Sequence, residues 1–230
     1  MSDALEQAVA VMDRLRSPGG CPWDASQTHQ SLARYLIEET YETIEAIETD
    51  NMALLREELG DLLLQVLFHA RLAEELPPGE RFSVNDVAED LVAKLVRRHP
   101  HVFGSTDVAD ANEVNENWER LKVAEKGRTS AVDGVPLSQP ALALAGKLVT
   151  RAERAHLRVD VSGEGIGGRL FALAREAANA GIDPESALRD TTRRFRAAIL
   201  AAEAARDSAE YRSATYGSGT LESPIQHDEA

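Results

Sequence analysis

Apolar residues recur every three or four positions along most of the chain, and these stretches are separated by Gly, Pro or polar residues. The stretch 3–16 shows the pattern, because one stripe at the period of an α-helix is formed by Leu5, Ala8, Val9, Met12 and Leu15. The same reasoning predicts further helices over 28–49, 51–76, 84–98, 111–126, 140–156, 165–180 and 184–206. The sequence therefore predicts an all-α protein, built as helical bundles.

Local signals fix where several of these helices begin. Asp50 is a good N-cap for the helix from 51, and Ser83 caps the helix that runs to Arg98. Asp110 with Glu113 has the spacing of a capping box and opens the helix over 111–126. These signals support the helix starts that the apolar stripes predict.

Breaks in the pattern divide the chain into four parts. We expect a first helical domain over 1–126 and a linker over 127–138, which contains Gly and Pro residues. A smaller helical domain follows over 139–206. The end of the chain, 207–230, is predicted to be a disordered tail.

Charge and cysteine content narrow the functional classes. The chain of 230 residues has 39 acidic and 25 basic side chains, a net charge of −14. Such a chain is a poor general binder of nucleic acid, whose affinity depends on neutralising phosphates. Cys21 is the only cysteine, so no intrachain disulfide forms and a reducing compartment is expected. With no signal peptide or membrane-spanning run in the sequence, we expect a cytoplasmic protein without a membrane partner.

Five carboxylates occur in two short clusters on consecutive predicted helices. Glu38, Glu39 and Glu42 project from one side of the first helix, because successive residues differ by about 100° around its axis. Glu58 and Asp61, three residues apart, share a side of the next helix. A short turn between the helices would fold them into an antiparallel hairpin, so that the two clusters face each other.

Five like charges at close range repel one another unless a cation neutralises them, and Mg²⁺ is the usual partner of such oxygen ligands. A solvated acidic helix face is the alternative, and it is the commoner arrangement of a charge run. We weigh against it for two reasons. Gly60 is unfavourable in the middle of a helix and is easier to explain where something approaches closely, and apolar residues surround the acids and predict burial. These residues are Leu36, Ile37, Tyr41, Ile44, Leu59, Leu62, Leu63 and Leu64.

The two clusters resemble the metal-binding signature of the MazG-type nucleoside triphosphate pyrophosphohydrolases, Glu-Glu-x-x-Glu followed by Glu-x-x-Asp. Three further stretches resemble the same family: Cys21-Pro22-Trp23-Asp24, the run from Lys94 to Gly104, and the run from Asn117 to Lys122. The four motifs occur in order over residues 5–126, which makes the resemblance specific.

The resemblance implies a dimeric all-α enzyme that hydrolyses nucleoside triphosphates to the monophosphate and pyrophosphate. It implies Mg²⁺, with Mn²⁺ as a substitute, held by the five acids Glu38, Glu39, Glu42, Glu58 and Asp61. Glu39 and Glu42 are both candidate catalytic residues. Of the two, we choose Glu39 to accept the proton of the attacking water. The partners expected are the nucleotide and a second copy of the chain, in a role that clears the nucleotide pool.

Basic and aromatic residues are the candidates for substrate contact. Lys94 and Arg98, four apart, share a helix face and would hold phosphate and assist catalysis, although two cations also complement a helix C-terminus. Arg97 points about 100° away from Arg98 and is the weaker candidate. The resemblance assigns Trp118 and Lys122 to substrate contact. Trp23 is a further candidate for holding the base or sugar, with packing as the alternative for each of these residues.

The second half resembles a reduced copy of a MazG domain. When the run from Glu164 to Phe171 is laid beside Glu57 to Leu64, Gly165 stands in place of Glu58 and Gly168 in place of Asp61. We therefore predict that the second half is catalytically inert and serves packing, oligomerisation or regulation.

Two other interpretations stay open from the sequence. One is a non-catalytic helical interaction module with a solvated acidic surface. The other is an all-α pyrophosphatase of narrow specificity for one deoxynucleotide or a damaged one. His69, in an apolar stretch, is expected to be a core histidine with its hydrogen bonds satisfied.

Overall fold

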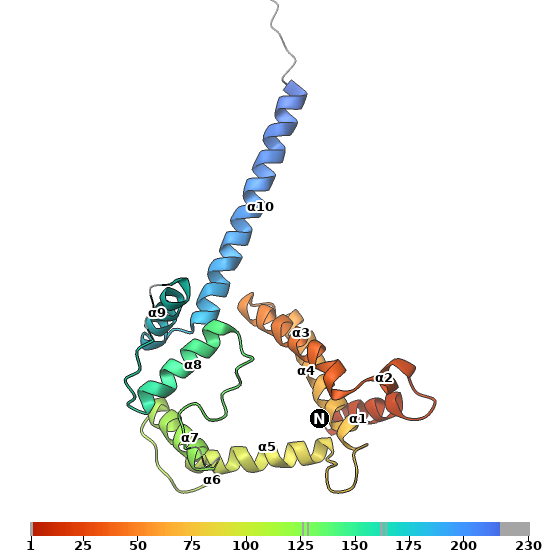
Figure 1. The fold of residues 1–230 in the computed structure, drawn as a ribbon. Helices are drawn as coiled ribbons and strands as arrows, with labels where there is room; N and C mark the ends of the chain where they lie inside the picture. The colour runs from red at the N-terminus through yellow and green to blue at the C-terminus, as the bar shows by residue number, and fades with distance from the viewer. Residues whose placement is uncertain (1, 126, 128, 162, 164, 217–230) are drawn as a thin grey trace, which may run out of the picture. The chain divides into compact units, whose positions relative to one another are not determined.

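The computed structural model describes residues 2–125, 127, 129–161, 163 and 165–216. Every element assigned in that part of the chain is a helix, so the predicted all-α class is confirmed (Figure 1). The helices are α1 Ser2–Arg16, α2 Pro22–Ser26, α3 His29–Glu48, α4 Met52–Ala73, α5 Val84–Arg98, α6 Pro100–Phe103, α7 Ala111–Glu125, α8 Ala141–Arg154, α9 Ile166–Asn179 and α10 Pro184–Tyr216.

The chain separates into two compact units, residues 1–122 and 123–230. The first unit contains both acid clusters, and the second contains α8, α9 and α10. The finer boundaries expected from the sequence, at 126, 138 and 206, stay a prediction.

Helices α3 and α4 form the antiparallel hairpin that the sequence predicts, and the turn between them differs in one detail. Asn51, not Asp50, is the N-cap of α4, and its side chain accepts a hydrogen bond from the Leu54 amide at 3.1 Å. Asp50 has a φ of 53°, the left-handed conformation that Asp tolerates better than most residues. The cap therefore shifts by one residue, because Asp50 is used to reverse the chain.

The core of the first unit lies where α1 crosses the end of the hairpin. Its buried apolar side chains come from α1, α3 and α4, and they are Met12, Leu32, Leu67, Phe68 and Leu72. Tyr35 and Val84 pack against this group from α3 and the start of α5. The core thus fixes the two hairpin helices against each other below the acid clusters.

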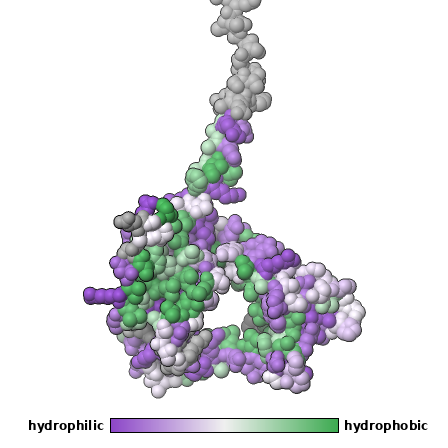
Figure 2. Space-filling model, in the orientation of Figure 1, coloured by the Kyte–Doolittle hydropathy of each residue, from purple (hydrophilic) through white to green (hydrophobic). Residues whose placement is uncertain are grey.

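The apolar residues beside the acids are largely exposed, which contradicts the burial predicted for them. On α3, Ile37 is 58% exposed, and on α4, Leu59 is 52% exposed; Leu36, Tyr41, Leu63 and Leu64 are also exposed. Among the described helices of the first unit, none covers these faces of the hairpin. Figure 2 shows green apolar patches beside purple hydrophilic ones on the face of the molecule that is in view.

Helices α5 to α7 follow the hairpin. Ser83 caps α5 in a reciprocal box with Asp86, as predicted for the start of this helix. Asp110 accepts a hydrogen bond from the Glu113 amide at 3.0 Å, while the Glu113 carboxylate accepts from the Ala109 amide at 2.8 Å. Helix α6 lies in a stretch between the helices predicted over 84–98 and 111–126, and it forms because Pro100 is a favourable first residue for a new helical turn.

In the second unit, α8 packs against α9 and α10. Gly181 has a φ of 73° and ends α9, and Asp183 accepts a hydrogen bond from the Ser186 amide at 3.1 Å as the cap of α10. Helix α10 continues to Tyr216, ten residues beyond its predicted end, because no Gly or Pro occurs before Gly217. Residues 217–230 of the predicted tail lie outside the described residues, and so does Glu164 of the degenerate motif.

Candidate metal centre

Three carboxylates from the two hairpin helices converge on one point. Glu39 comes from α3, and Glu58 and Asp61 come from α4; one oxygen of each lies within 4.8 Å of the others. Glu58 is buried, with 7% of its surface exposed, while Glu39 and Asp61 are half-buried. The antiparallel packing of α3 on α4 therefore brings together acids that are far apart in the sequence.

The electrostatics of this cluster are unfavourable without a cation. The pKa of Glu39 is raised, first by burial and then by the negative charges of Asp61, Glu42, Glu58 and Glu38. The pKa of Glu58 is also raised, first by burial and then by the charges of Glu42, Asp61 and Glu57. Both shifts mean that the protein carries negative charge here against a cost, which a bound cation would remove.

The other two expected ligands flank the cluster. Glu38 and Glu42 are exposed on α3, and neither belongs to the group of three converging oxygens. Glu42 is nevertheless the neighbouring charge with the largest effect on Glu58, and Glu38 contributes to the shift at Glu39. The five acids thus form a core of three and a flank of two.

The donor set fits a hard divalent cation. Mg²⁺ takes six oxygen ligands and commonly keeps several waters, so three carboxylates leave positions for water and phosphate. Mn²⁺ accepts the same oxygen ligands. The residues present are therefore suitable for either ion.

A buried arginine fixes the segment before α3 against the end of α4. Arg16 pairs with the Glu75 carboxylate through two hydrogen bonds of 3.0 and 2.8 Å, and its Nη1 donates to the carbonyl oxygens of Asp24 and Gln27. Trp23, in the segment held in this way, packs edge-on against Tyr35 and Phe68 at centroid distances of 5.9 and 6.4 Å. About half of the Trp23 side chain remains exposed and available for a ligand.

The expected phosphate and base contacts lie on α5 and α7. Arg98 is buried, with its guanidinium 5.4 Å from the centroid of the Trp118 ring, and His99 packs on the same ring at 4.8 Å. Lys94 and Lys122 are half-buried on the same two helices. Figure 1 shows α6 and α7 at the end of α5 that is remote from α4. Arg98 on α5 therefore packs against Trp118 on α7, and neither of these helices carries the acid cluster.

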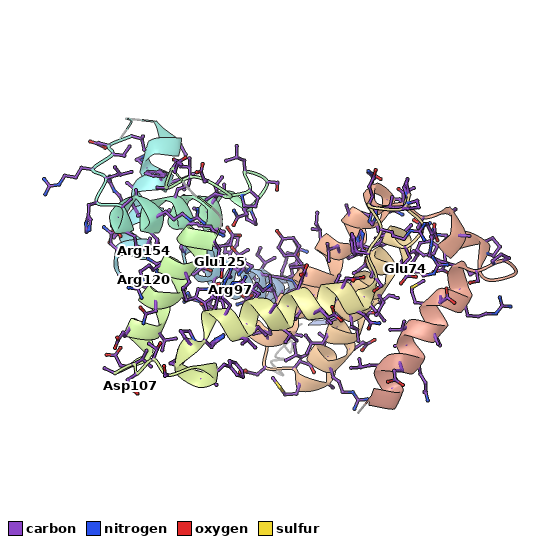
Figure 3. All side chains as sticks on the ribbon, turned by 90° about the horizontal axis from the view of Figure 1, so that it is seen from below. Glu74, Arg97, Asp107, Arg120, Glu125 and Arg154 are labelled. Atoms are coloured by element: carbon purple, nitrogen blue, oxygen red, sulfur yellow. The ribbon has the colours of Figure 1, made fainter. Side chains whose placement is uncertain are left out.

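Arg97 differs from Arg98 as the helix geometry predicts. It is exposed on the last turn of α5, with Nη1 3.5 Å from the Ala93 carbonyl oxygen (Figure 3). The two neighbouring arginines thus point to different environments.

Sequence reasoning missed contacts that depend on the register of the hairpin. His29 and His69 lie stacked, with their Nδ1 atoms 2.7 Å apart. The expectation of a fully satisfied His69 is wrong in one respect, because its buried Nε2 has no hydrogen-bond partner among the described residues. Gln65 was also missed, although its spacing of four and seven residues from Asp61 and Glu58 places it on the acid face of α4.

The model of the MazG nucleotide pyrophosphohydrolase domain matches residues 27–103, which include the whole hairpin and α5. A Thermotoga maritima protein, called nucleoside triphosphate pyrophosphohydrolase/pyrophosphatase MazG, is 39% identical over 83% of this chain and 82% of its own length. A nucleoside triphosphate pyrophosphohydrolase of Mycolicibacterium smegmatis is 43% identical over 90% of this chain, which spans 64% of that relative.

A 26.1 kDa protein of Streptomyces cacaoi, described as uncharacterized, is 51% identical over 86% of this chain and 82% of its own length. No helix among the described residues is long and apolar enough to cross a membrane. The similarity to relatives that the chain covers over most of their length, together with the domain match, shows that the chain belongs to the MazG nucleotide pyrophosphohydrolase family.

Proposed function

We propose that this protein hydrolyses nucleoside triphosphates to a nucleoside monophosphate and pyrophosphate at the α3–α4 acid cluster, with Mg²⁺. The observation that carries this proposal is the convergence of Glu39, Glu58 and Asp61 within the segment that matches the family model. A role in clearing unwanted nucleotides fits such a reaction, and the cytoplasmic location expected from the sequence stays a prediction.

The three carboxylates of this cluster would hold Mg²⁺, which supplies charge neutralisation for the phosphates. Water attacks phosphorus, the P–O bond between the α and β phosphates breaks, and pyrophosphate leaves. One proton of the water must be accepted by the protein. We assign this role to Glu39, because its carboxylate lies with those of Glu58 and Asp61 at the point where the cation and the attacking water would bind. Glu42 and Glu38, on the same side of α3, add negative charge that strengthens cation binding.

Cationic and aromatic residues stay our proposed substrate contacts, although α7 lies at the end of α5 that is remote from the acid-bearing helix α4 of the same chain. Lys94 and Lys122 would bind phosphate oxygens, and Arg98 would add a planar donor set for the same group. Trp118, which lies against Arg98, and the half-exposed Trp23 are the proposed contacts for the base or sugar.

We also propose that the active assembly is a homodimer. Two helix faces of the hairpin are apolar and exposed, one on α3 with Leu36, Ile37 and Tyr41, and one on α4 with Met52, Leu59, Leu63 and Val66. The four α4 residues lie at helical spacing on one side of that helix, and Ile37 and Tyr41 are four residues apart on one side of α3, with Leu36 about 100° from Ile37 around the axis. Exposed apolar faces of this kind are unusual for a surface facing water. A second copy of the hairpin would cover them.

A pyrophosphate-release assay on a panel of ribo- and deoxynucleoside triphosphates, with Mg²⁺ or with a chelator, tests the function. We expect Mg²⁺-dependent formation of monophosphate and pyrophosphate. Glu58→Gln should reduce turnover by at least about a hundredfold, more than the loss of a group that merely supports a metal ligand. Glu57→Gln, an exposed neighbour on α4, is the matched control and should retain activity. Full activity in Glu58→Gln would refute the assignment of the cluster.

A further inference from the structure

Gln65 lies on the same face of α4 as the acid cluster. For an ideal helix it is about 20° from Glu58 and about 40° from Asp61 around the axis, and about 6 Å beyond Asp61 along it. Helical side chains lean toward the N-terminus of their helix. The Gln65 side chain therefore leans toward the turn that holds Asp61.

The register of the hairpin places Gln65 in the seam between the two helices. Glu39 faces Glu58 and Asp61, and His29, ten residues earlier on α3, contacts His69 on α4. Gln65 falls between these two pairs. Its exposed fraction is 4%, as expected for a residue in the seam.

The amide of Gln65 is not fully satisfied. Its Oε1 is buried and accepts no hydrogen bond from any described residue. The neighbouring groups on this face, the carboxylates of Glu58 and Asp61, accept hydrogen bonds and cannot donate when ionised. Because a buried acceptor without a donor lowers stability, an apolar residue of similar size would suit the folded protein better. His69, four residues further along α4, also has a ring nitrogen that can carry a hydrogen, but this nitrogen makes no hydrogen bond to Gln65 and is itself without a partner among the described residues. We therefore expect the missing donor to arrive with a ligand.

We propose that Gln65 is a ligand-binding residue whose Oε1 accepts a hydrogen bond from an O–H group of the bound metal–nucleotide. The donor is either a water on the metal or a hydroxyl of the sugar, since both bring the same chemistry to this turn of the seam. The amide group turns about its broad terminal torsion to meet the donor. This inference rests on the proposed function of the acid cluster.

The test uses the full-length protein and the variant Gln65→Met, which keeps the length of the side chain and removes its polar atoms. We expect the metal-free variant to melt at the same temperature as the wild type or higher. One arm measures Mn²⁺ affinity without nucleotide. The other measures affinity for non-hydrolysable ribo- and deoxynucleoside triphosphates with Mg²⁺. We expect about three- to tenfold weaker binding in at least one arm, the loss of one hydrogen bond.

The two arms distinguish the donors. Weaker Mn²⁺ binding assigns the donor to a metal-bound water, whereas a loss confined to the nucleotide arm assigns it to a sugar hydroxyl. Gln30→Met, the same change at an exposed position of α3, is the control and should bind like the wild type. Gln65→Asn, which withdraws the amide by one methylene group, replaces the Met variant if that variant does not fold.

Unchanged affinity in both arms would overturn the inference. If the wild type itself binds no Mn²⁺ and no nucleotide, the proposed function fails instead, so the two failures are distinguishable.

Discussion

Replacing Arg16 with Met tests how the segment with Trp23 is held against the hairpin. The Arg16 side chain is 5% exposed and makes two hydrogen bonds to the Glu75 carboxylate, at 3.0 and 2.8 Å. It also donates to two backbone carbonyl oxygens, and its guanidinium lies 5.6 Å from the centroid of the Phe68 ring. Met keeps most of the length of the aliphatic stem and removes the guanidinium, with every one of these donors and its contact with the Phe68 ring.

The expected cost follows from how exposed the partner is. Removing one member of a fully buried ion pair costs about 3–5 kcal/mol. The Glu75 side chain is 42% exposed and keeps an ion pair of 3.0 Å with Arg71, so water and Arg71 would solvate the carboxylate that is left. The two carbonyl oxygens lose their donor in a partly buried place. We therefore expect a loss of about 2–3 kcal/mol in the free energy of unfolding, below the range for a fully buried pair.

Urea unfolding, monitored by tryptophan fluorescence, measures this loss of stability in the first unit. The chain has two tryptophans, Trp23 and Trp118, and both belong to the first unit. Arg14→Met is the control, because Arg14 is exposed and its hydrogen bonds to described residues go to the carbonyl oxygens of Pro18 and Gly19. That control should change stability by no more than about 0.5 kcal/mol. An Arg16→Met variant as stable as Arg14→Met would refute the assignment of Arg16 as the clamp.

The pH dependence gives the same prediction a second readout. The pKa of Glu75 is lowered, chiefly by its hydrogen bond to Arg16. A lowered pKa contributes stability that is present above the usual value of 4.5 and is lost as pH falls through the lowered pKa. The difference between wild type and Arg16→Met should therefore shrink as the pH is lowered below 4.5. Because Trp23 loses its support, the variant should also show a higher KM with a smaller change in kcat.

Three further predictions concern the acid cluster and its surroundings. Without metal, Glu58→Gln should melt at a higher temperature than wild type at pH 7–8, because the raised pKa of Glu58 makes its ionised form unfavourable. The difference in melting temperature should become smaller as the pH falls toward 4.5. A difference that does not change across this pH range would contradict the assigned cause. Leu59→Glu should convert a dimer to a monomer in sedimentation analysis, whereas Val11→Glu, at an equally exposed position of α1, should not. The full-length double variant with Glu58→Gln and Glu42→Gln should have no Mg²⁺-dependent activity. Residual turnover in this double variant would point to the second unit.

The periodic part of the fold was predictable from the sequence, because a helix stripe and its cap are local features. Ser83 and Asp110 were assigned as caps from residue type alone, and the structure shows both side chains accepting the expected amide hydrogen bonds. The turn at Asp50 was less predictable, because both Asp50 and Asn51 are good caps and the choice depends on which one adopts a positive φ. The end of α10 was missed because an Ala-rich helix without Gly or Pro has no local signal to stop.

The features of the candidate site that could be predicted are those that depend on the geometry of a single helix. Spacing placed Glu58 and Asp61 on one side of α4, and Glu38, Glu39 and Glu42 on one side of α3. Which of the three glutamates faces α4 depends on the rotation of α3 about its axis, and that rotation is set by core residues such as Leu32. The same holds for Gln65 and the His29–His69 pair, whose environment depends on the register between the helices. The exposure of Ile37 and Leu59 depends on a partner, which no single-chain pattern specifies.

The costs in the first unit are concentrated on one face of α4, and this concentration is itself an argument for function. Glu58 and Asp61 bring like charges together. In the part of the chain that the structure describes, the buried Oε1 of Gln65 has no donor and the buried Nε2 of His69 has no partner. A helix selected for stability alone would carry apolar residues at these positions, as it does at Leu72. Opposing these costs, the core and the Arg16 clamp fix the hairpin at the end next to His69. A rigid support beside a stripe of unsatisfied polar groups is what a site needs when its missing partners, a cation and a nucleotide, arrive only on binding.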